Sequence, residues 1–167
     1  HRGDWKYCRI DVRAKLPAGK GIWPAIWMLP TDEKYGGWAS SGEIDIMELV
    51  GSEPSTYHGT LHFGGEWPGN KYKGGKFKLA TGTFADDFHI FSLNWKKGMI
   101  TWAIDGEVWQ TEEKWFSEKS KFPAPFDQRF HLLINLAVGG QWPGNPDAST
   151  QFPATMLVDY VRVYQGG

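Results

Sequence analysis

The chain has 167 residues, which is enough for one domain with a substantial core. Its formal net charge of −1 gives no reason to expect a nucleic acid or a membrane surface as partner. No apolar run approaches the roughly 20 residues of a membrane span, and Cys8, the single cysteine, excludes an internal disulfide.

Aromatic residues are the unusual part of the composition. The chain has ten tryptophans, and aromatic residues together make up 16% of it. An indole ring offers a flat apolar face and an N–H donor, which suits a binding site with one wet side. Sugar rings also have flat faces edged by hydroxyls, so an aromatic cleft is a reasonable receptor for them. We expect about half of the tryptophans to lie in the core instead.

Residues 5–16 predict a first strand, because every second side chain is apolar. Residues 17–21 form a turn, and residues 22–29 predict a second strand, which Pro24 places near a sheet edge or a bulge. Trp23 and Trp27 are four residues apart and therefore share a face of an unbulged strand.

Residues 41–50 set three acids among apolar side chains, in the sequence SGEIDIMELV. In a strand, Glu43 and Asp45 share one face, and strict alternation would put Glu48 on the opposite, apolar face. An unpaired carboxylate in an apolar layer is costly. We therefore predict a β-bulge near residues 46–47 that returns Glu48 to the face of the other two acids.

Three neighbouring acids have a chemical meaning of their own. Two carboxylates that face one bond are the minimum equipment for glycoside hydrolysis, one as nucleophile and one as proton donor. Like charges so close cannot all stay ionised at low cost, so at least one pKa should be raised. The alternatives are a calcium site or a solvated acidic strand face.

The next segments add candidate binding residues. The loop of residues 31–40 contains Trp38 just before the acidic strand, so Trp38 is a candidate sugar platform, with core packing as the alternative. Residues 55–63 predict a strand in which His58 and His62 share a face, and we expect no zinc because a third nearby ligand is missing. His62 reaches the acids if this strand pairs beside them, and is otherwise a structural histidine.

The remaining chain reads as short strands and turns. Residues 64–75 are rich in Gly, Pro and Lys and predict a mobile loop over the rim of a cleft. Residues 111–121 form at most a short helix. Residues 129–138 predict a strand from which Asn135 reaches the cleft, and a long loop with Trp142 follows. Short alternating strands without a long helix indicate an all-β fold, a two-sheet β-sandwich.

The acidic motif, Glu-Ile-Asp-Ile-Met-Glu, resembles the active-site strand of glycoside hydrolase family 16 in its bulged form. That form is typical of laminarinase-like endo-β-1,3-glucanases, and Met47, the bulge residue, favours β-1,3-glucan as the substrate. Four further segments are similar to the family, and the resemblance covers residues 5–164. These segments are residues 15–30, 59–65, 135–140 and 158–164.

The resemblance implies a jelly roll (concanavalin A-like) with a concave sugar-binding face. It implies an endo-acting, retaining hydrolase of β-1,3-glucan (laminarin) that needs no cofactor for its chemistry and is secreted. Glu43 would be the nucleophile, Glu48 the general acid/base, and Asp45 the residue that tunes the pair.

The resemblance also extends the set of candidate site residues. Trp23 belongs to the cleft by resemblance, Trp27 shares its face, and Trp142 would hold a glucosyl unit. Asp159 matches a position that often helps to bind a structural calcium in the family. The full set of expected substrate-binding residues is Trp23, Trp27, Trp38, His62, Asn135 and Trp142.

Family members normally carry further residues ahead of residue 5, including strands at the sheet edges. We therefore expect residues 1–167 to be a single catalytic domain that lacks some N-terminal strands, with an exposed sheet edge that pairs with another copy. Two other functions stay open: a non-catalytic β-glucan-binding module, and a hydrolase of mixed-linkage β-1,3-1,4-glucan or of a marine galactan.

Overall fold

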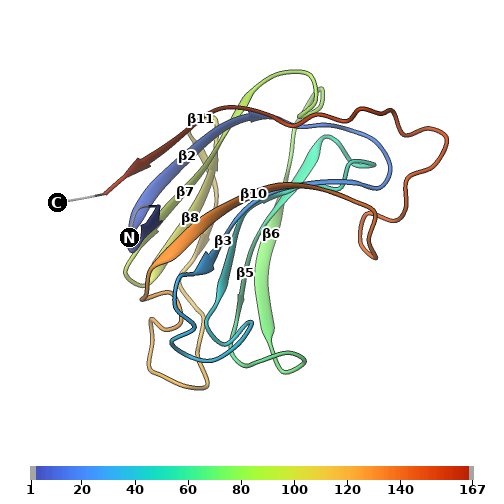
Figure 1. Cartoon of the computed structure of the whole chain (residues 1–167). Helices are drawn as coiled ribbons and strands as arrows, with labels where there is room; N and C mark the ends of the chain where they lie inside the picture. The colour runs from blue at the N-terminus through green and yellow to red at the C-terminus, as the bar shows by residue number, and fades with distance from the viewer. Residues whose placement is uncertain (1–2, 166–167) are drawn as a thin grey trace.

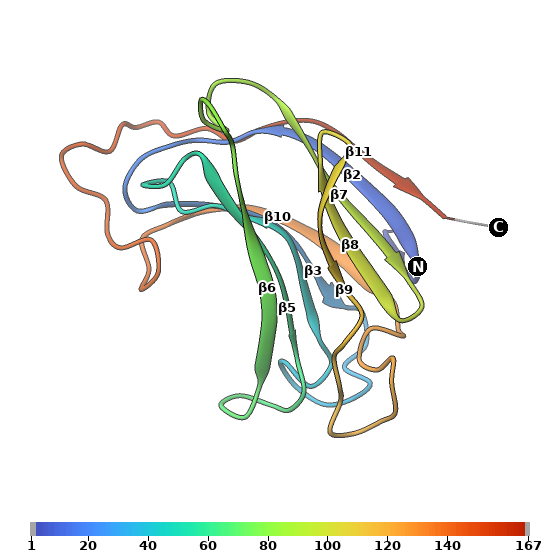
Figure 2. The ribbon, with the colours of Figure 1, turned by 180° about the vertical axis from the view of Figure 1, so that it is seen from behind.

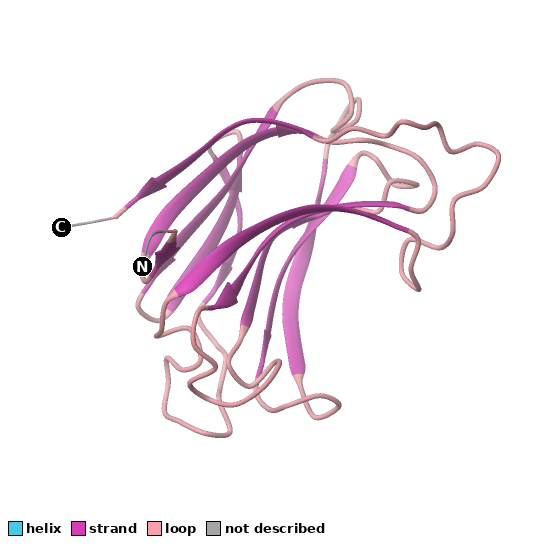
Figure 3. Cartoon of the chain, viewed as in Figure 1, coloured by secondary structure: helices cyan, strands magenta, loops and turns pink. Residues whose placement is uncertain are grey.

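The computed structural model describes residues 3–165, and within these residues it contains β-strands and no helix (Figures 1 and 3). The strands are β1 (Asp4–Trp5), β2 (Cys8–Lys15), β3 (Ile22–Pro30), β4 (Glu43–Glu48), β5 (Thr56–Phe63), β6 (Lys71–Lys78), β7 (His89–Lys96), β8 (Met99–Ile104), β9 (Glu107–Glu112), β10 (Phe130–Val138) and β11 (Leu157–Tyr164). None of the described residues forms a helix that could span a membrane.

The strands form two antiparallel sheets that pack as a sandwich. One sheet has the order β1-β10-β3-β4-β5-β6, and the other has the order β11-β2-β7-β8-β9. Figure 1 shows the first sheet curving beneath the second. The all-β, two-sheet jelly-roll prediction is confirmed.

The core lies between the sheets and follows the alternation of the strands. On β2, the alternating residues Ile10, Val12 and Ala14 are completely buried. Large rings from the opposite layers fill the middle, among them Tyr57 of β5 and Trp102 of β8. Side chains on the other face of the β1–β6 sheet are left free to line a site.

The start of the chain differs from the prediction. Residues 5–16 do not form one strand, because Tyr7 has a left-handed backbone conformation with φ 57° and separates two short elements. Trp5 pairs with Phe130 in one sheet, whereas the strand from Cys8 onward belongs to the other. The chain therefore changes sheets at Tyr7, and the apolar alternation could not show this.

Residues 64–75 were predicted to form a loop, and this is wrong for residues 71–75. They belong to β6, which pairs with β5 without a break in register from Thr56↔Lys78 to Phe63↔Lys71. Figure 2 shows β6 at the outer border of its sheet. Lysine-rich, glycine-containing sequences are typical of edge strands, because they discourage pairing with other chains.

Pro24 lies in β3, which is central and not at an edge. The backbone carbonyl of Pro24 accepts a hydrogen bond from Leu49 N at 3.1 Å, and Leu49 is the first residue after the end of β4. The missing N–H of Pro24 faces the same side, and the pairing continues beyond it, because Gly51 N donates to the Ile22 carbonyl at 2.7 Å. Pro24 therefore leaves out one hydrogen bond inside a central strand, two residues from the register shift that the β4 bulge introduces.

Candidate active site

The bulge in β4 is present where the alternation of residues 43–48 predicts it. Met47 lies opposite Ile26, but Asp45 already lies opposite Trp27, so one residue is extra between them. The register also shifts against β5 between Asp45 and Glu48. Because of the extra residue, Glu48 returns to the face of the other acids while its apolar neighbours stay buried.

A non-local contact supports the bulged strand from below. Trp102 is completely buried and donates its indole N–H to the backbone carbonyl of Asp45 at 2.8 Å. Gly59 in β5 gives the indole its space, since a Cβ on Gly59 would lie 2.6 Å from the Trp102 ring. The three residues together fix the backbone under the acids.

The acids open into a cavity of about 230 Å³ on the outer face of the sheet. Its walls come from β3, β4 and β10, and the long indoles alternate with small side chains that leave room. The lining residues are Trp23, Ala25, Trp27, Glu43, Asp45, Glu48, Asn135 and Ala137.

Glu43 is partly buried and has specific partners. Trp38 donates its indole N–H to Glu43 Oε2 at 2.7 Å, and His62 Nε2 lies 3.7 Å from Glu43 Oε1. Burial raises the pKa of Glu43, whereas His62, the Trp38 hydrogen bond and a hydrogen bond with Asp45 all act to lower it. These partners favour the ionised form of Glu43 against its burial.

Asp45 is the most buried of the acids, with 2% of its surface exposed. Burial, followed by the neighbouring charge of Glu43, raises the pKa of Asp45 well above its usual range. A shared hydrogen bond raises the pKa of Asp45 and lowers that of Glu43. This is the pattern of a protonated Asp45 that donates to an ionised Glu43.

Glu48 also holds a proton at neutral pH. Burial is the largest cause, and the charges of Asp45 and Glu43 add to it, so that the pKa of Glu48 rises to about 8. Trp23 donates its indole N–H to Glu48 Oε1 at 3.2 Å. The carboxyl group therefore has a fixed position and a proton to give.

The aromatic and amide residues predicted for substrate binding gather around these acids. The indole N–H of Trp27 donates to Asn135 Oδ1 at 2.8 Å, which fixes both cavity-lining side chains. Trp142 packs edge-on against Trp23, with ring centroids 5.5 Å apart. Trp38 is 41% exposed, so its alternative role as a core residue is excluded.

His62 lies beside the acids and is therefore not merely structural. Its Nε2 atom is 3.3 Å from Asp45 Oδ2, and its backbone pairs with Glu43. Its ring also lies 5.5 Å from that of Trp38, measured between centroids. His62 links the two acids of the first half of β4 to the indole that holds Glu43.

Sequence reasoning missed two kinds of residue. Ala25 and Ala137 make room in the cavity, and alternation along β3 and β10 was a sufficient signal for both. His58 contacts Trp142, with ring centroids 5.0 Å apart, and its backbone pairs with Glu48. No local signal marks this contact, because Trp142 lies in a loop far along the chain.

Asp159 does not fit the predicted calcium site. Its carboxylate is paired with Arg13 Nη1 at 2.6 Å, so a cation already neutralises it. Among residues 3–165, the one group of three ligating side chains within reach of each other is Glu43, Asp45 and His62, which belongs to the site above. The geometry gives no reason to route any step through a metal at Asp159.

A β-sandwich that carries paired carboxylates in an indole-lined cavity has the parts of a glycoside hydrolase. The chain belongs to glycoside hydrolase family 16, because the model of Glycosyl hydrolases family 16 matches residues 2–162. This confirms the resemblance seen in the acidic motif.

Individual relatives are similar over nearly the whole chain. The glucan endo-1,3-beta-glucosidase A1 of Niallia circulans is 51% identical, covering 96% of this chain and 24% of that protein. The beta-1,3-glucan-binding protein of Penaeus monodon is 39% identical, covering 92% of this chain and 48% of that protein. The solved laminarinase from Rhodothermus marinus is 40% identical at a TM-score of 0.86, covering 98% of this chain and 67% of that one. The chain thus spans about a quarter and about half of the two curated relatives.

Proposed function

We propose that residues 1–167 form a single catalytic domain that hydrolyses β-1,3-glucan within the polymer and retains the anomeric configuration. The observation that carries this proposal is the different surroundings of two acids on one face of β4. Burial raises the pKa of Glu43, but His62 and hydrogen bonds with Trp38 and Asp45 act to lower it, whereas burial and the neighbouring acids raise the pKa of Glu48 to about 8. A retaining glycosidase needs this pairing of nucleophile and proton donor.

In the first step, the Glu43 carboxylate attacks the anomeric carbon of the sugar. The bond from that carbon to the leaving oxygen breaks, and Glu48 gives its proton to this oxygen. The products are a shortened glucan with a new hydroxyl group, a glycosyl ester on Glu43, and an ionised Glu48. Asp45 keeps its proton and its hydrogen bond to Glu43, which limits the negative charge in the cavity.

In the second step, Glu48 acts as a base. It takes a proton from water, and the water oxygen attacks the anomeric carbon while the ester bond to Glu43 breaks. Glu43 is again a carboxylate and Glu48 again holds a proton. The sugar would rest against Trp23, Trp27 and the other indoles around the cavity, whose flat faces suit pyranose rings.

A direct test measures reducing ends released from laminarin. The wild type should release oligosaccharides, and Glu43→Gln should lose turnover by several orders of magnitude while still binding oligosaccharide. Glu107→Gln is the matched control, because Glu107 is exposed on β9 in the other sheet. Near-wild-type activity of Glu43→Gln would show that Glu43 is not the nucleophile.

A second candidate function is glucan binding without catalysis. It is favoured by the 39% identity to a protein named for β-1,3-glucan binding. The intact acids and the proton on Glu48 argue for catalysis instead. Calorimetric binding of laminarin by the wild type without any release of reducing ends would decide for the binding module.

Substrate linkage is a separate question with the same mechanism. The bulge at residues 46–47 favours β-1,3-glucan over mixed-linkage β-1,3-1,4-glucan or a marine galactan. Laminarin, lichenan and agarose, assayed side by side, separate these substrates by kcat/KM. As a β-glucan hydrolase acting on an extracellular polymer, the protein would be secreted.

We further propose self-association through the open side of the sandwich. In the described chain, β1 pairs with only the first two residues of β10, and β11 is the border of the other sheet. Figure 1 shows these borders on the same side. Apolar residues there are exposed, including Ile134 at 38%, Val138 at 55% and Val161 at 40%. Light scattering at micromolar concentration should show a dimer, and a strictly monomeric profile would contradict it.

A further inference from the structure

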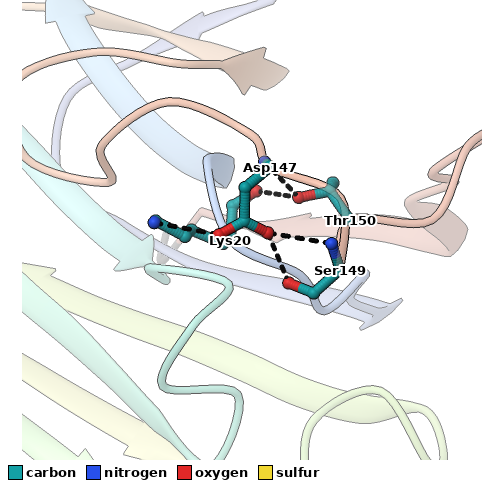
Figure 4. A network of polar contacts seen from close by, with 4 residues as sticks. All are labelled: Lys20, Asp147, Ser149 and Thr150. Atoms are coloured by element: carbon teal, nitrogen blue, oxygen red, sulfur yellow. Dashed lines mark hydrogen bonds and ion pairs between the residues drawn. The ribbon is translucent and has the colours of Figure 1, made fainter.

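The loop of residues 139–150 carries Trp142 and is tied down at its far end. Lys20 donates to Asp147 Oδ2 at 3.0 Å, and the Thr150 hydroxyl donates to the Lys20 carbonyl at 2.8 Å (Figure 4). Ser149 donates both its backbone N–H and its hydroxyl to Asp147 Oδ1. The loop therefore has a fixed base on the turn before β3.

A close backbone contact fixes the same part of the loop. Gly21 has φ +74° and lies so close to Pro146 that a Cβ on Gly21 would collide with it. These contacts hold residues 146–150, but none of them reaches Trp142. The position of the Trp142 ring depends on what it touches across the cleft.

Trp142 contacts one ring from each of two strands. It meets Trp23 of β3 edge-on, with centroids 5.5 Å apart and planes at 89°. It meets His58 of β5 edge-on, with centroids 5.0 Å apart and planes at 73°. Both neighbours are tied to Glu48: Trp23 donates a hydrogen bond to its carboxyl group, and His58 lies directly opposite it across the β-ladder.

We propose that His58 is a positioning residue that holds the Trp142 ring against Trp23 and so keeps water away from Glu48. The proposal rests on the acid/base role of Glu48 argued above. His58 is not among the residues that line the cavity of the acids, and it acts through the ring of Trp142. Burial is the largest cause of the raised pKa of Glu48, so loss of this wall should lower that pKa.

The chemistry around His58 suits a packing role. Burial, with Lys76 in support, lowers the pKa of His58, and Glu53 opposes this. A pKa below the ordinary histidine value leaves the ring mostly neutral from pH 7 upward, where the limb of Glu48 lies, so it adds no positive charge beside that acid there. A neutral, half-buried ring can be replaced by phenylalanine with its edge contact retained.

The test follows the alkaline limb of the pH dependence of kcat/KM on laminarin, which reports the general acid of the free enzyme. His58→Ala should move this limb from near pH 8 downward by about one unit or more, and reduce kcat/KM at pH 8 by about fivefold or more. His58→Phe should retain the wild-type limb. His89→Ala removes a histidine from the other sheet and should leave the limb in place.

A double-mutant cycle separates positioning from general structural damage. Trp142→Ala should produce the same downward shift, and adding His58→Ala to it should shift the limb no further. Additive shifts, or an unmoved limb in His58→Ala, would overturn the proposal. If His58→Ala does not fold, His58→Leu, which has no ring edge to set against Trp142, takes its place in the cycle, and an unmoved limb in His58→Leu would equally overturn the proposal.

The inference can fail separately from the proposed activity. An inactive wild type would contradict the hydrolase proposal, and the pKa of Glu48 is then read directly by carbon-13 NMR of labelled carboxyl groups. In that experiment His58→Ala should lower the titration midpoint of Glu48 relative to the wild type. An unchanged midpoint would overturn the role of His58 whatever the activity.

Discussion

Gly59 lies against the ring of Trp102, directly beneath the bulge that carries the acids. A Cβ at Gly59 would lie 2.6 Å from the ring, and the same ring donates a hydrogen bond to the Asp45 carbonyl at 2.8 Å. The geometry of the acids thus depends on a glycine in the next strand and on an indole from the opposite sheet.

Gly59→Ala should therefore lower both stability and activity. The added methyl group forces the indole or the β5 backbone to move, which costs about 1–3 kcal/mol in a packed core. Differential scanning calorimetry measures the loss, with Gly37→Ala as control because a Cβ there makes only ordinary contacts. A Gly59→Ala protein as stable as the wild type would mean that Trp102 does not support the bulge.

The activity should fall as the pH rises above about 8. Glu48 must be protonated to donate to the leaving oxygen, and burial with the neighbouring acid charges raises its pKa to about 8. The pH profile of kcat/KM on laminarin should show this limb. A limb near pH 5, close to the ordinary pKa of glutamate, would contradict the burial of the protonated acid.

Glu48 should also make stability depend on pH. The pKa of Glu48 is higher in the folded protein than in the unfolded chain. Its contribution to stability is therefore fully present at a pH below the unfolded-state pKa, and it is lost as the pH rises toward about 8. The free energy of unfolding of Glu48→Gln, relative to that of the wild type, should increase by on the order of 3 kcal/mol from pH 5 to pH 9. Denaturant unfolding at both pH values measures the difference. An equal gap at the two pH values would contradict the raised pKa.

Asp147 should show the opposite sign. Hydrogen bonds from Ser149 and Lys20 lower its pKa to about 2, so its contribution is present above the ordinary aspartate value and is lost as the pH falls toward 2. Asp147→Asn should loosen residues 139–150 at neutral pH, which hydrogen exchange detects as faster exchange in that loop. Asp32→Asn, an exposed aspartate in another loop, is the control. Unchanged protection in Asp147→Asn would show that the network does not anchor the loop.

Calcium at Asp159 is tested by removing metal. Because Arg13 already pairs with this carboxylate, we expect the same melting temperature in EDTA and in millimolar calcium. A ligand that binds only the folded state raises the melting temperature with its concentration. Such a rise with calcium, lost in Asp159→Asn, would restore the predicted calcium site.

The acids and their bulge were predictable because the cost of burying Glu48 among isoleucines is local to one strand. The support from Trp102 was not, since it joins residues 57 positions apart. The contact of His58 with Trp142 is hidden from sequence for the same reason. Residues 71–75 were misread because glycine and lysine are common both in loops and in edge strands, and only pairing with β5 separates the two.

Azide rescue tests the central claim, the division of roles between Glu43 and Glu48, most directly. With Glu48→Ala, the glycosyl ester on Glu43 should still form from an activated substrate, and azide should then yield the β-glycosyl azide. With Glu43→Ala, azide should replace the nucleophile and yield the α-glycosyl azide. NMR of the products reads the configuration, and the reverse assignment would contradict the proposed mechanism.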